Sequence, residues 1–251
     1  MPMAATPPIY PKIVVGYEEN DRGEDARVLG ERIAERDGGE LKVIHVEKGS
    51  PSDALQALAE RGDADLIVLG STHRAHLGSV APGSVAEHLL HGARCRLVIA
   101  PKGYGRVDHS QDRLRVAAVG FDGMAESYAA LDEAARLATK FGGSLRVIGV
   151  ATPVPAMGAA AAHAAGAEAG PDFQSQLNNA VAELPPELRA LPVLQRGDPV
   201  EKLLEAADMG VDLLVLGSRG FGPVMRLLIG SVSSRVIRKA SCPVLVVPRP
   251  A

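Results

Sequence analysis

The feature that most constrains the fold of this chain is an internal repeat, in which two similar segments lie 147 positions apart. The earlier copy reads LIVLGSTHRAHLGSVAPGSVAEHLLHGARCRLVIAPK, and the later copy reads LLVLGSRGFGPVMRLLIGSVSSRVIRKASCPVLVVPR. Each copy opens and closes with an apolar run of strand length. A chain of 251 residues with such a repeat is expected to fold as two domains of similar size.

Apolar runs of strand length alternate with amphipathic segments of helix length in both halves, which is typical of a parallel α/β sheet. In the second half this pattern predicts five strands, at Arg115–Phe121, Leu145–Val150, Leu191–Gln195, Leu213–Leu216 and Pro243–Val247. It predicts helices at Glu126–Phe141, Val200–Ala207 and Ser231–Lys239, the second of them with Asp198 as its N-cap.

The first half is shorter in its middle. Ile44 aligns with Ile148 at an offset of 104, whereas the sequence from Leu66 onward aligns at 147, so 43 residues are missing after the second strand. We therefore expect an α/β fold of two parallel-sheet domains in tandem, the first trimmed by about one strand and one helix. The predicted domains are residues 1–104 and 113–251, joined by the polar linker Lys102–Asp112.

The extra segment of the second half contains an alanine-rich stretch, residues 156–169. Alanine favours a helix, but Gly158 and Gly166 weaken one, so a helix and a surface loop both remain open.

Charge and apolar content narrow the classes of partner. The net charge of −3 gives no electrostatic basis for binding nucleic acid or an anionic membrane. No apolar run approaches the length of a membrane span, and the first residues lack the pattern of a signal peptide. Cys95 and Cys242 occupy equivalent repeat positions, as buried structural cysteines do, so we expect no disulfide. The expected location is cytoplasmic.

The later copy of the repeat carries a spaced glycine pattern, Gly217-x2-Gly220-x9-Gly230-Ser231. Glycines between a buried strand and a helix that starts at serine suit a loop whose backbone N–H groups face an anion. Together with the closing CPVLVVP, this spacing resembles the nucleotide-binding signature of the universal stress protein family. The resemblance covers nearly all of both halves and identifies the chain as a tandem member of that family.

The family resemblance implies two Rossmann-like domains of the adenine nucleotide hydrolase-like type, with ATP, with or without Mg²⁺, bound in the second. By resemblance, Asp122 bonds the adenine and the Val150 backbone pairs with it. The glycine segments hold ribose and phosphate. The nucleotide-binding residues predicted in this way are Phe121, Asp122, Val150, Leu216, Gly217, Arg219, Gly220, Gly230, Ser231, Val232 and Ser233.

Each of these residues also has a purely structural explanation. Asp122 could form a simple turn with the glycine after it, and Gly217 could serve only loop geometry. Ser231 could be an ordinary N-cap, and Arg219 could be a solvated surface charge. Their joint register and order favour nucleotide binding.

The first half departs from the pattern at several positions. Glu18 stands where Asp122 does, and Thr72 and His73 replace Arg219 and Gly220. The side chain of His73 would fill space that a phosphate loop needs, and a positive φ there would be strained. The closing pair, residues 83–84, is kept. We predict weak or no nucleotide binding by this half.

Four histidines of the first half, at spacings of three, need a separate explanation: His73, His76, His88 and His91. They could converge on a transition metal or carry a pH-dependent charge. No cysteine or carboxylate at ligand spacing supports a metal site, so we interpret them as surface residues and predict no metal.

The sequence lacks the parts of a dedicated enzyme. It has no GxxxxGK[ST] loop and no G-x-S-x-G elbow, so we predict no catalytic residues and at most slow, incidental ATP hydrolysis. The expected function is that of a stress-response module that holds or senses adenine nucleotide and acts on a protein partner. The alternatives are a nucleotide-dependent enzyme of the adenine nucleotide hydrolase-like group and an interaction pair without nucleotide.

The family resemblance also predicts how the two halves meet. Family members pair domains through the last strand, which here is Arg96–Ala100 in one half and Pro243–Val247 in the other. An exposed apolar edge strand promotes aggregation unless it is paired, so we expect these two strands to lie antiparallel. A homodimer of the whole chain remains open.

Overall fold

A computed structural model describes residues 6–45, 51–92, 95–108, 114–152, 171–218 and 230–248 of the chain. The elements of the first half are β1 (Lys12–Tyr17), α1 (Asp21–Asp37), β2 (Glu40–His45), α2 (Pro51–Glu60), β3 (Leu66–Gly70), α3 (Ser84–Gly92), β4 (Arg96–Ala100) and the 3₁₀ turn η1 (Tyr104–Arg106). Those of the second half are β5 (Val116–Phe121), α4 (Ala125–Lys140), β6 (Ser144–Ala151), α6 (Pro171–Ala182), β7 (Arg189–Arg196), α7 (Pro199–Asp208), β8 (Leu213–Gly217), α8 (Ser231–Ile237) and β9 (Val244–Val247).

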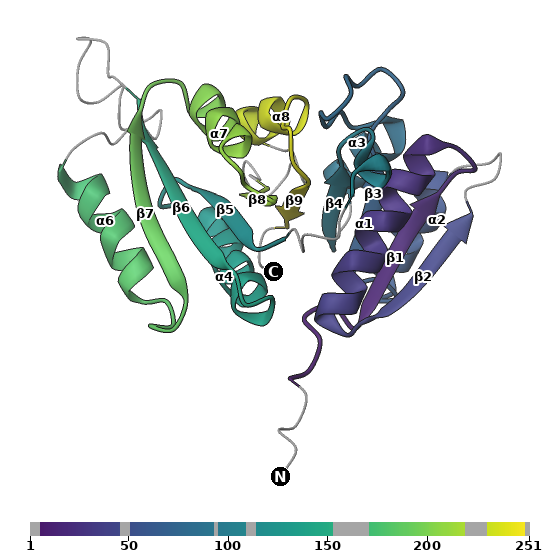
Figure 1. Cartoon of the computed structure of the whole chain (residues 1–251), viewed down its shortest axis with the longest axis horizontal. Coiled ribbons are helices and arrows are strands. Elements are labelled where there is room, and N and C mark those ends of the chain that lie inside the picture. The colour runs from purple at the N-terminus through teal and green to yellow at the C-terminus, as the bar shows by residue number, and fades with distance from the viewer. Residues whose placement is uncertain are drawn as a thin grey trace.

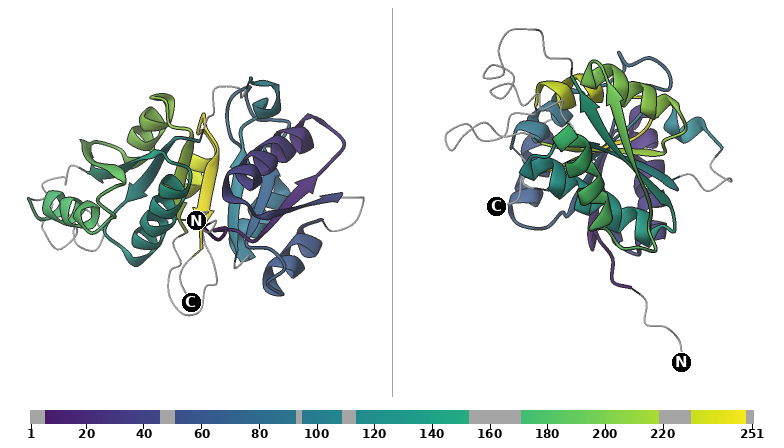
Figure 2. Two further views of the ribbon diagram at one scale, coloured as in Figure 1. Left: turned by 60° about the horizontal axis from the view of Figure 1, so that its bottom comes forward. Right: turned by 90° about the vertical axis from the view of Figure 1, so that its left-hand side faces the viewer.

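The strands form one nine-stranded sheet in the order β2-β1-β3-β4-β9-β8-β5-β6-β7 (Figure 1). Within each half all pairings are parallel, and the halves join through the antiparallel pair β4–β9, where Val98 lies opposite Leu245. This confirms the predicted pairing of the last strands. Figure 2 shows β9 (yellow) beside the teal strands of the first half.

The hydrophobic core consists of two clusters, one on each face of the sheet, and both clusters extend across the junction between the halves. Helices α1, α4 and α6 cover one face, and α2, α3, α7 and α8 cover the other. Valine, leucine, isoleucine and alanine supply most of the buried side chains. Because both cores cross the β4–β9 seam, burial of apolar surface joins the halves into a single folded body.

The shorter first half has four strands where the second has five, as predicted. In the second half, α6 and β7 lie between β6 and α7, whereas only five residues separate β2 from α2. Five residues cannot hold a helix and a strand, so the outer edge of the first half is β2 itself. The outer strand of the second half, β7, contains Pro192, which is tolerated at a sheet edge.

Most predicted boundaries agree with the structure to within about two residues. Asp198 is the N-cap of α7, as predicted, since its Oδ1 accepts from the N–H groups of Val200 and Glu201 at 2.9 and 3.1 Å. The N-cap of α8 is Gly230, so Ser231 is the first helical residue and the proposal that it caps the helix is wrong. The alanine-rich stretch 156–169 lies outside the described residues.

The linker is more ordered at its start than its polar composition suggests. The N–H groups of Gly103 and Gly105 each donate to the Asp25 carboxylate of α1 at 2.8 Å. Tyr104, between them, is buried. Burial raises the pKa of the Asp25 carboxyl, while the two backbone donors act in the opposite direction. One buried side chain of the first half thus fixes the chain as it leaves β4.

The two cysteines are free and buried, as predicted. Burial raises the pKa of each thiol to about 12. Cys95 precedes β4 and Cys242 precedes β9, and because these strands are antiparallel the two thiols lie at opposite ends of the pair. A disulfide between them is therefore excluded by topology.

Candidate functional site

The second half has a topological switch point between β5 and β8. The chain proceeds from β5 outward through β6 to β7, and then returns to place β8 on the other side of β5. In open parallel sheets, ligands bind at the carboxyl ends of the strands at such a point. Because Val119 pairs with Val215, Phe121 and Gly217 end their strands at the same level.

The structure brings several predicted residues together at this edge. Asp122 follows β5, Val150 lies at the end of β6, and Leu216 and Gly217 end β8. Gly230 and the first turn of α8 follow after residues 219–229. Two predicted residues, Arg219 and Gly220, lie outside the described part of the chain.

Asp122 forms a turn at the end of β5. Its Oδ1 accepts from the N–H of Met124 at 3.0 Å, and Gly123 adopts a φ of +77°. A side chain at position 123 would also collide with Gln176 of α6, because a Cβ there would lie 2.5 Å from the Gln176 Oε1. The structural role considered for Asp122 is therefore real, and the turn fixes where its carboxylate lies.

An aromatic cluster that the sequence analysis missed lies beside this turn. The ring of Phe121 meets Tyr128 of α4 edge-on at 5.0 Å and stacks with Phe173 of α6 at 6.4 Å. The chain has only four phenylalanines and four tyrosines, and three of these eight meet at one strand end. Because aromatic residues are so few in this chain, their positions could have suggested a cluster. The sequence spacing alone does not show that Phe173 lies beside the other two.

Gly217 has a packing requirement that does not depend on any ligand. A Cβ at this position would lie 2.5 Å from the carbonyl oxygen of Glu126 in the first turn of α4. The Gly217 carbonyl accepts a hydrogen bond from the Ser233 Oγ at 3.1 Å, which ties α8 to β8. The hydroxyl hydrogen of Ser233, a predicted phosphate ligand, is thus used within the protein.

Ser218, directly after Gly217, carries a buried hydroxyl. The residue is 5% exposed, and its N–H donates to the Val247 carbonyl at 2.9 Å. Within the described ranges the Ser218 Oγ has no hydrogen-bond partner. A buried hydroxyl without a partner costs about 1–3 kcal/mol, so this group favours any bound molecule that bonds to it.

The first residues of α8 differ in how exposed they are. Ser231 is exposed, whereas Val232 is partly buried against the core cluster on the α7–α8 face. Gly230 has an extended backbone with φ −56° and ψ 151°, and its carbonyl accepts the Ser234 N–H at 2.9 Å. The backbone at Gly230 is therefore open to any residue type.

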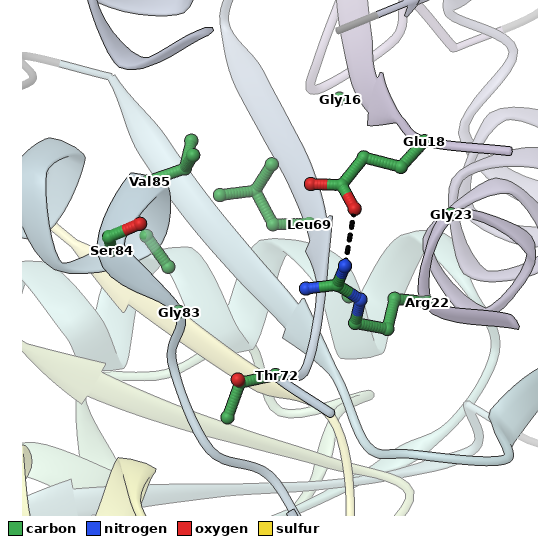
Figure 3. A pocket seen from close by; sticks show the side chains of 11 residues that line it. Gly16, Glu18, Arg22, Gly23, Leu69, Thr72, Gly83, Ser84 and Val85 are labelled. Atoms are coloured by element: carbon green, nitrogen blue, oxygen red, sulfur yellow. Dashed lines mark hydrogen bonds and ion pairs between the residues drawn. The ribbon is translucent and has the colours of Figure 1, made fainter. Parts of the chain in front are cut away.

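The first half has its own switch point, between β1 and β3, and a small cavity lies there (Figure 3). The cavity has a volume of about 80 Å³ and is lined by residues that include Glu18, Arg22, Thr72 and Ser84. In Figure 3, the Glu18 and Arg22 side chains point toward one another, and a 2.6 Å ion pair joins them. The Glu18 carboxylate, which stands where Asp122 does in the second half, is therefore paired with a positive charge of the same domain.

The loop between β3 and α3, residues 71–83, corresponds to the predicted phosphate loop of the second half. Six of its backbone N–H groups already donate to protein acceptors: those of Thr72, Ala75, Gly78, Ser79, Val80 and Ala81. Ser71, the counterpart of Ser218, donates to the Ala100 carbonyl at 2.7 Å and accepts from Ala81 at 3.1 Å. Half of the twelve backbone N–H groups of this loop, which contains one proline, are therefore used within the protein rather than by a phosphate.

His73 does not act as the sequence analysis expected. Its side chain is exposed and does not line the cavity, and its φ is not positive. The predicted steric block by His73 is therefore wrong. The cavity is restricted by the Glu18–Arg22 ion pair and by the closed loop.

The ring of His88 has polar partners on a neighbouring helix. The His88 Nε2 lies 2.8 Å from the Gln56 Oε1 and 3.9 Å from the Asp53 Oδ1, so this ring joins α3 to α2. Among the described residues, no three His, Cys, Asp or Glu side chains gather in a way that could hold a metal.

The described helices include none that is both long and apolar enough to cross a membrane.

The fold and these two switch points define a class: tandem Rossmann-like α/β units joined edge to edge in one sheet. The profile of the universal stress protein family matches residues 2–101 and again residues 114–248. The chain therefore belongs to the universal stress protein family and carries two copies of its domain.

Several known proteins are similar to this chain along most of its length. A universal stress protein of Mycobacterium tuberculosis (strain ATCC 25618 / H37Rv) is 30% identical over 222 residues, covering 84% of this chain and 74% of the relative. One from Mycolicibacterium smegmatis is 27% identical over 253 residues, covering 96% and 81%. The crystal structure of a universal stress protein from Archaeoglobus fulgidus matches with a TM-score of 0.60 at 22% identity, covering 95% of this chain and 86% of that one. At that identity the solved structure establishes the fold alone.

Proposed function

We propose that the chain is a regulatory module that binds an adenine nucleotide, with ATP at the switch point of the second half. The observation that carries this proposal is that the Asp122 turn, the end of β8 and the start of α8 lie at the same edge of the sheet. The glycine pattern read from the sequence begins and ends at this place.

The residues present fit a nucleotide. The buried hydroxyl of Ser218 has no partner within the described residues, and a ribose or phosphate oxygen would supply one. The Asp122 turn holds a carboxylate where an adenine amino group could donate to it. The cluster around Phe121 gives the same edge an apolar wall.

We further propose that the protein holds its nucleotide rather than turning it over. A bound ATP would supply a polyphosphate whose presence or loss changes what the module presents to a partner. In the competing enzyme class, a glycine-rich loop after the first strand binds pyrophosphate. Here that position is a turn closed by Asp122 on the Met124 N–H, which does not suit such a loop. Release of pyrophosphate with a candidate acid would favour the enzyme instead.

The experiment is thermal unfolding with and without millimolar ATP, on the wild type and on two matched variants. Gly230→Glu places a carboxylate at the proposed phosphate segment, and Gly83→Glu makes the same change at the equivalent position of the first half. Neither glycine has a positive φ, so the backbone at both positions accepts a side chain, and a Cβ at Gly83 meets only the Thr72 Cβ, at 3.9 Å.

We expect ATP to raise the melting temperature of the wild type and of Gly83→Glu, but not that of Gly230→Glu. A ligand that binds only the folded state at a hundredfold excess over its Kd stabilises by about 2.7 kcal/mol. Absence of any shift in the wild type would overturn the proposal and favour an interaction pair without nucleotide.

A further inference from the structure

The closed loop of the first half reaches across the seam and contacts the second half. The N–H of Val80 donates to the carbonyl of Ala240 at 2.7 Å. Both residues are completely buried, and both belong to the core cluster on the α7–α8 face. A second contact joins the halves nearby, since Arg238 pairs with Glu87 of α3 at 2.8 Å between exposed side chains.

Ala240 lies in the turn that follows α8 and leads into β9. At its other end, α8 begins with Ser231, in the segment that the proposed function assigns to phosphate. The helix has seven residues, so its two ends are only about 10 Å apart. The same helix is tied to β8 through Ser233 and Gly217. A shift of the turn at Ala240 would therefore move the segment at Ser231.

Lys102 holds the loop in this position. Its Nζ donates to the carbonyls of His73 and Ala75 at 3.0 and 3.1 Å. Its backbone N–H donates to the Ser79 carbonyl at 3.0 Å, and its own carbonyl accepts from Gly78 at 2.8 Å.

Packing supports the loop poorly on one side. Leu77 is 75% exposed, and it borders a cavity of about 370 Å³ between the halves that Lys102 and Ser241 also line. The hydrogen bonds from Lys102, rather than close packing, therefore keep this part of the loop in place.

We propose that Lys102 and Val80 are positioning residues for the nucleotide site of the second half. The inference rests on the proposed function and adds a role for the first half. In this account the phosphate-loop equivalent of the first half no longer binds phosphate. Its Val80 N–H bonds to the turn after α8, its lysine partner keeps the loop in place, and together they fix the start of α8 for nucleotide binding.

The test compares ATP affinity, measured by calorimetry, in Lys102→Met and in the control Lys12→Met. Lys12 also donates its Nζ to a loop carbonyl of the first half, that of Gly62 at 2.9 Å, but it lies away from the seam. We expect Lys102→Met to weaken ATP binding by roughly three- to tenfold, Lys12→Met to leave it within about twofold, and Lys102→Arg to restore most of the loss. Equal affinities in Lys102→Met and the wild type would overturn the inference.

A second readout is the exchange rate of the Val80 amide relative to that of the buried Val14 amide in β1, away from the seam. ATP that stabilises the whole fold slows both amides, so extra protection of Val80 is the result that reports on the seam. By reciprocity, ATP bound in the second half must slow hydrogen exchange at Val80, and it must do so in Gly83→Glu but not in Gly230→Glu. Protection confined to the α8 region, with none at Val80, overturns the inference alone. No protection in either region would overturn the proposed function together with it.

Discussion

The two switch points of this molecule descend from the same repeat but differ in what surrounds them. At the second, the Ser218 hydroxyl is buried without a partner in the described residues, and Asp122 shapes an adjoining turn. At the first, the equivalent Ser71 is fully bonded, and the Glu18 carboxylate is paired with Arg22. Polar groups without a partner in the protein favour a ligand-binding site, whereas polar groups that bond to one another favour a purely structural role.

The largest difference at an equivalent position is Glu133 of α4, where α1 has the buried Leu29. Glu133 is 2% exposed and accepts two bonds from Arg96 of β4, at 3.0 and 3.2 Å. Glu133→Ala leaves Arg96 without this partner at the seam, and because Arg96 is 35% exposed and water can solvate it, we expect a loss of about 3 kcal/mol. Urea unfolding measures this loss. Its control is Arg136→Ala, which removes the more exposed partner of Glu133 and should cost less than about 1 kcal/mol. Equal losses in the two variants would contradict the account.

A second difference is Asp25, whose counterpart in the second half is Ala129. Asp25→Ala removes the acceptor from two backbone N–H groups of the linker, and we expect a loss of about 2–3 kcal/mol in the free energy of unfolding. Thermal or urea unfolding checks this, and a variant as stable as the wild type would show that the linker is held by other contacts.

The same residue gives a pH dependence with a defined sign. Because burial raises the pKa of Asp25, the folded state keeps the proton at pH values where the unfolded chain has released it. This contribution to stability is therefore present below the unfolded pKa and is lost as the pH rises through the folded pKa. Comparing the pH dependence of unfolding in the wild type and in Asp25→Asn isolates it, and identical profiles would contradict the assignment.

A smaller effect is expected from making the first switch point resemble the second. In Glu18→Asp/Arg22→Glu both positions carry the residue types of Asp122 and Glu126. We expect no second nucleotide to bind, because six N–H groups of loop 71–83 and the Ser71 hydroxyl stay bonded within the protein. Equilibrium dialysis that found two nucleotides per chain would show that the ion pair alone closes this half.

The smallest effect is expected where the halves agree. Burial raises the pKa of both Cys95 and Cys242 to about 12, so neither should react with iodoacetamide at pH 8 in the folded protein. Mass spectrometry should find both alkylated only after denaturation. Rapid labelling of one thiol in the folded protein would mean that the segment before its strand unfolds locally and exposes the cysteine.

Much of the fold was predictable because it depends on local pattern and on the repeat. The alternating apolar runs predicted the strands, and Asp198 predicted the start of α7. The change of repeat offset predicted that the first half lacks one helix and one strand. The pairing of β4 with β9 followed from the family resemblance, together with the need of an apolar edge strand for a partner. The start of α8 at Ser231 agreed, but the helix ends at Ile237 rather than Lys239, and its N-cap is Gly230.

The rest depended on contacts that no spacing encodes. Glu133 would be expected at a helix surface, since its partner Arg96 lies in the other half. The position of Phe173 beside Phe121 depends on how α6 packs. His73 was expected to block the first switch point, but the loop turns its side chain outward and Arg22 lines the cavity instead. Backbone donors such as the Val80 N–H carry no sequence signal at all.

The most direct test of the account is the stoichiometry of ATP binding by isothermal titration calorimetry on the intact chain. The account predicts one ATP per chain in the wild type, one in Gly83→Glu and none in Gly230→Glu. Two equivalent sites in the wild type, or one that survives Gly230→Glu and is lost in Gly83→Glu, would contradict it.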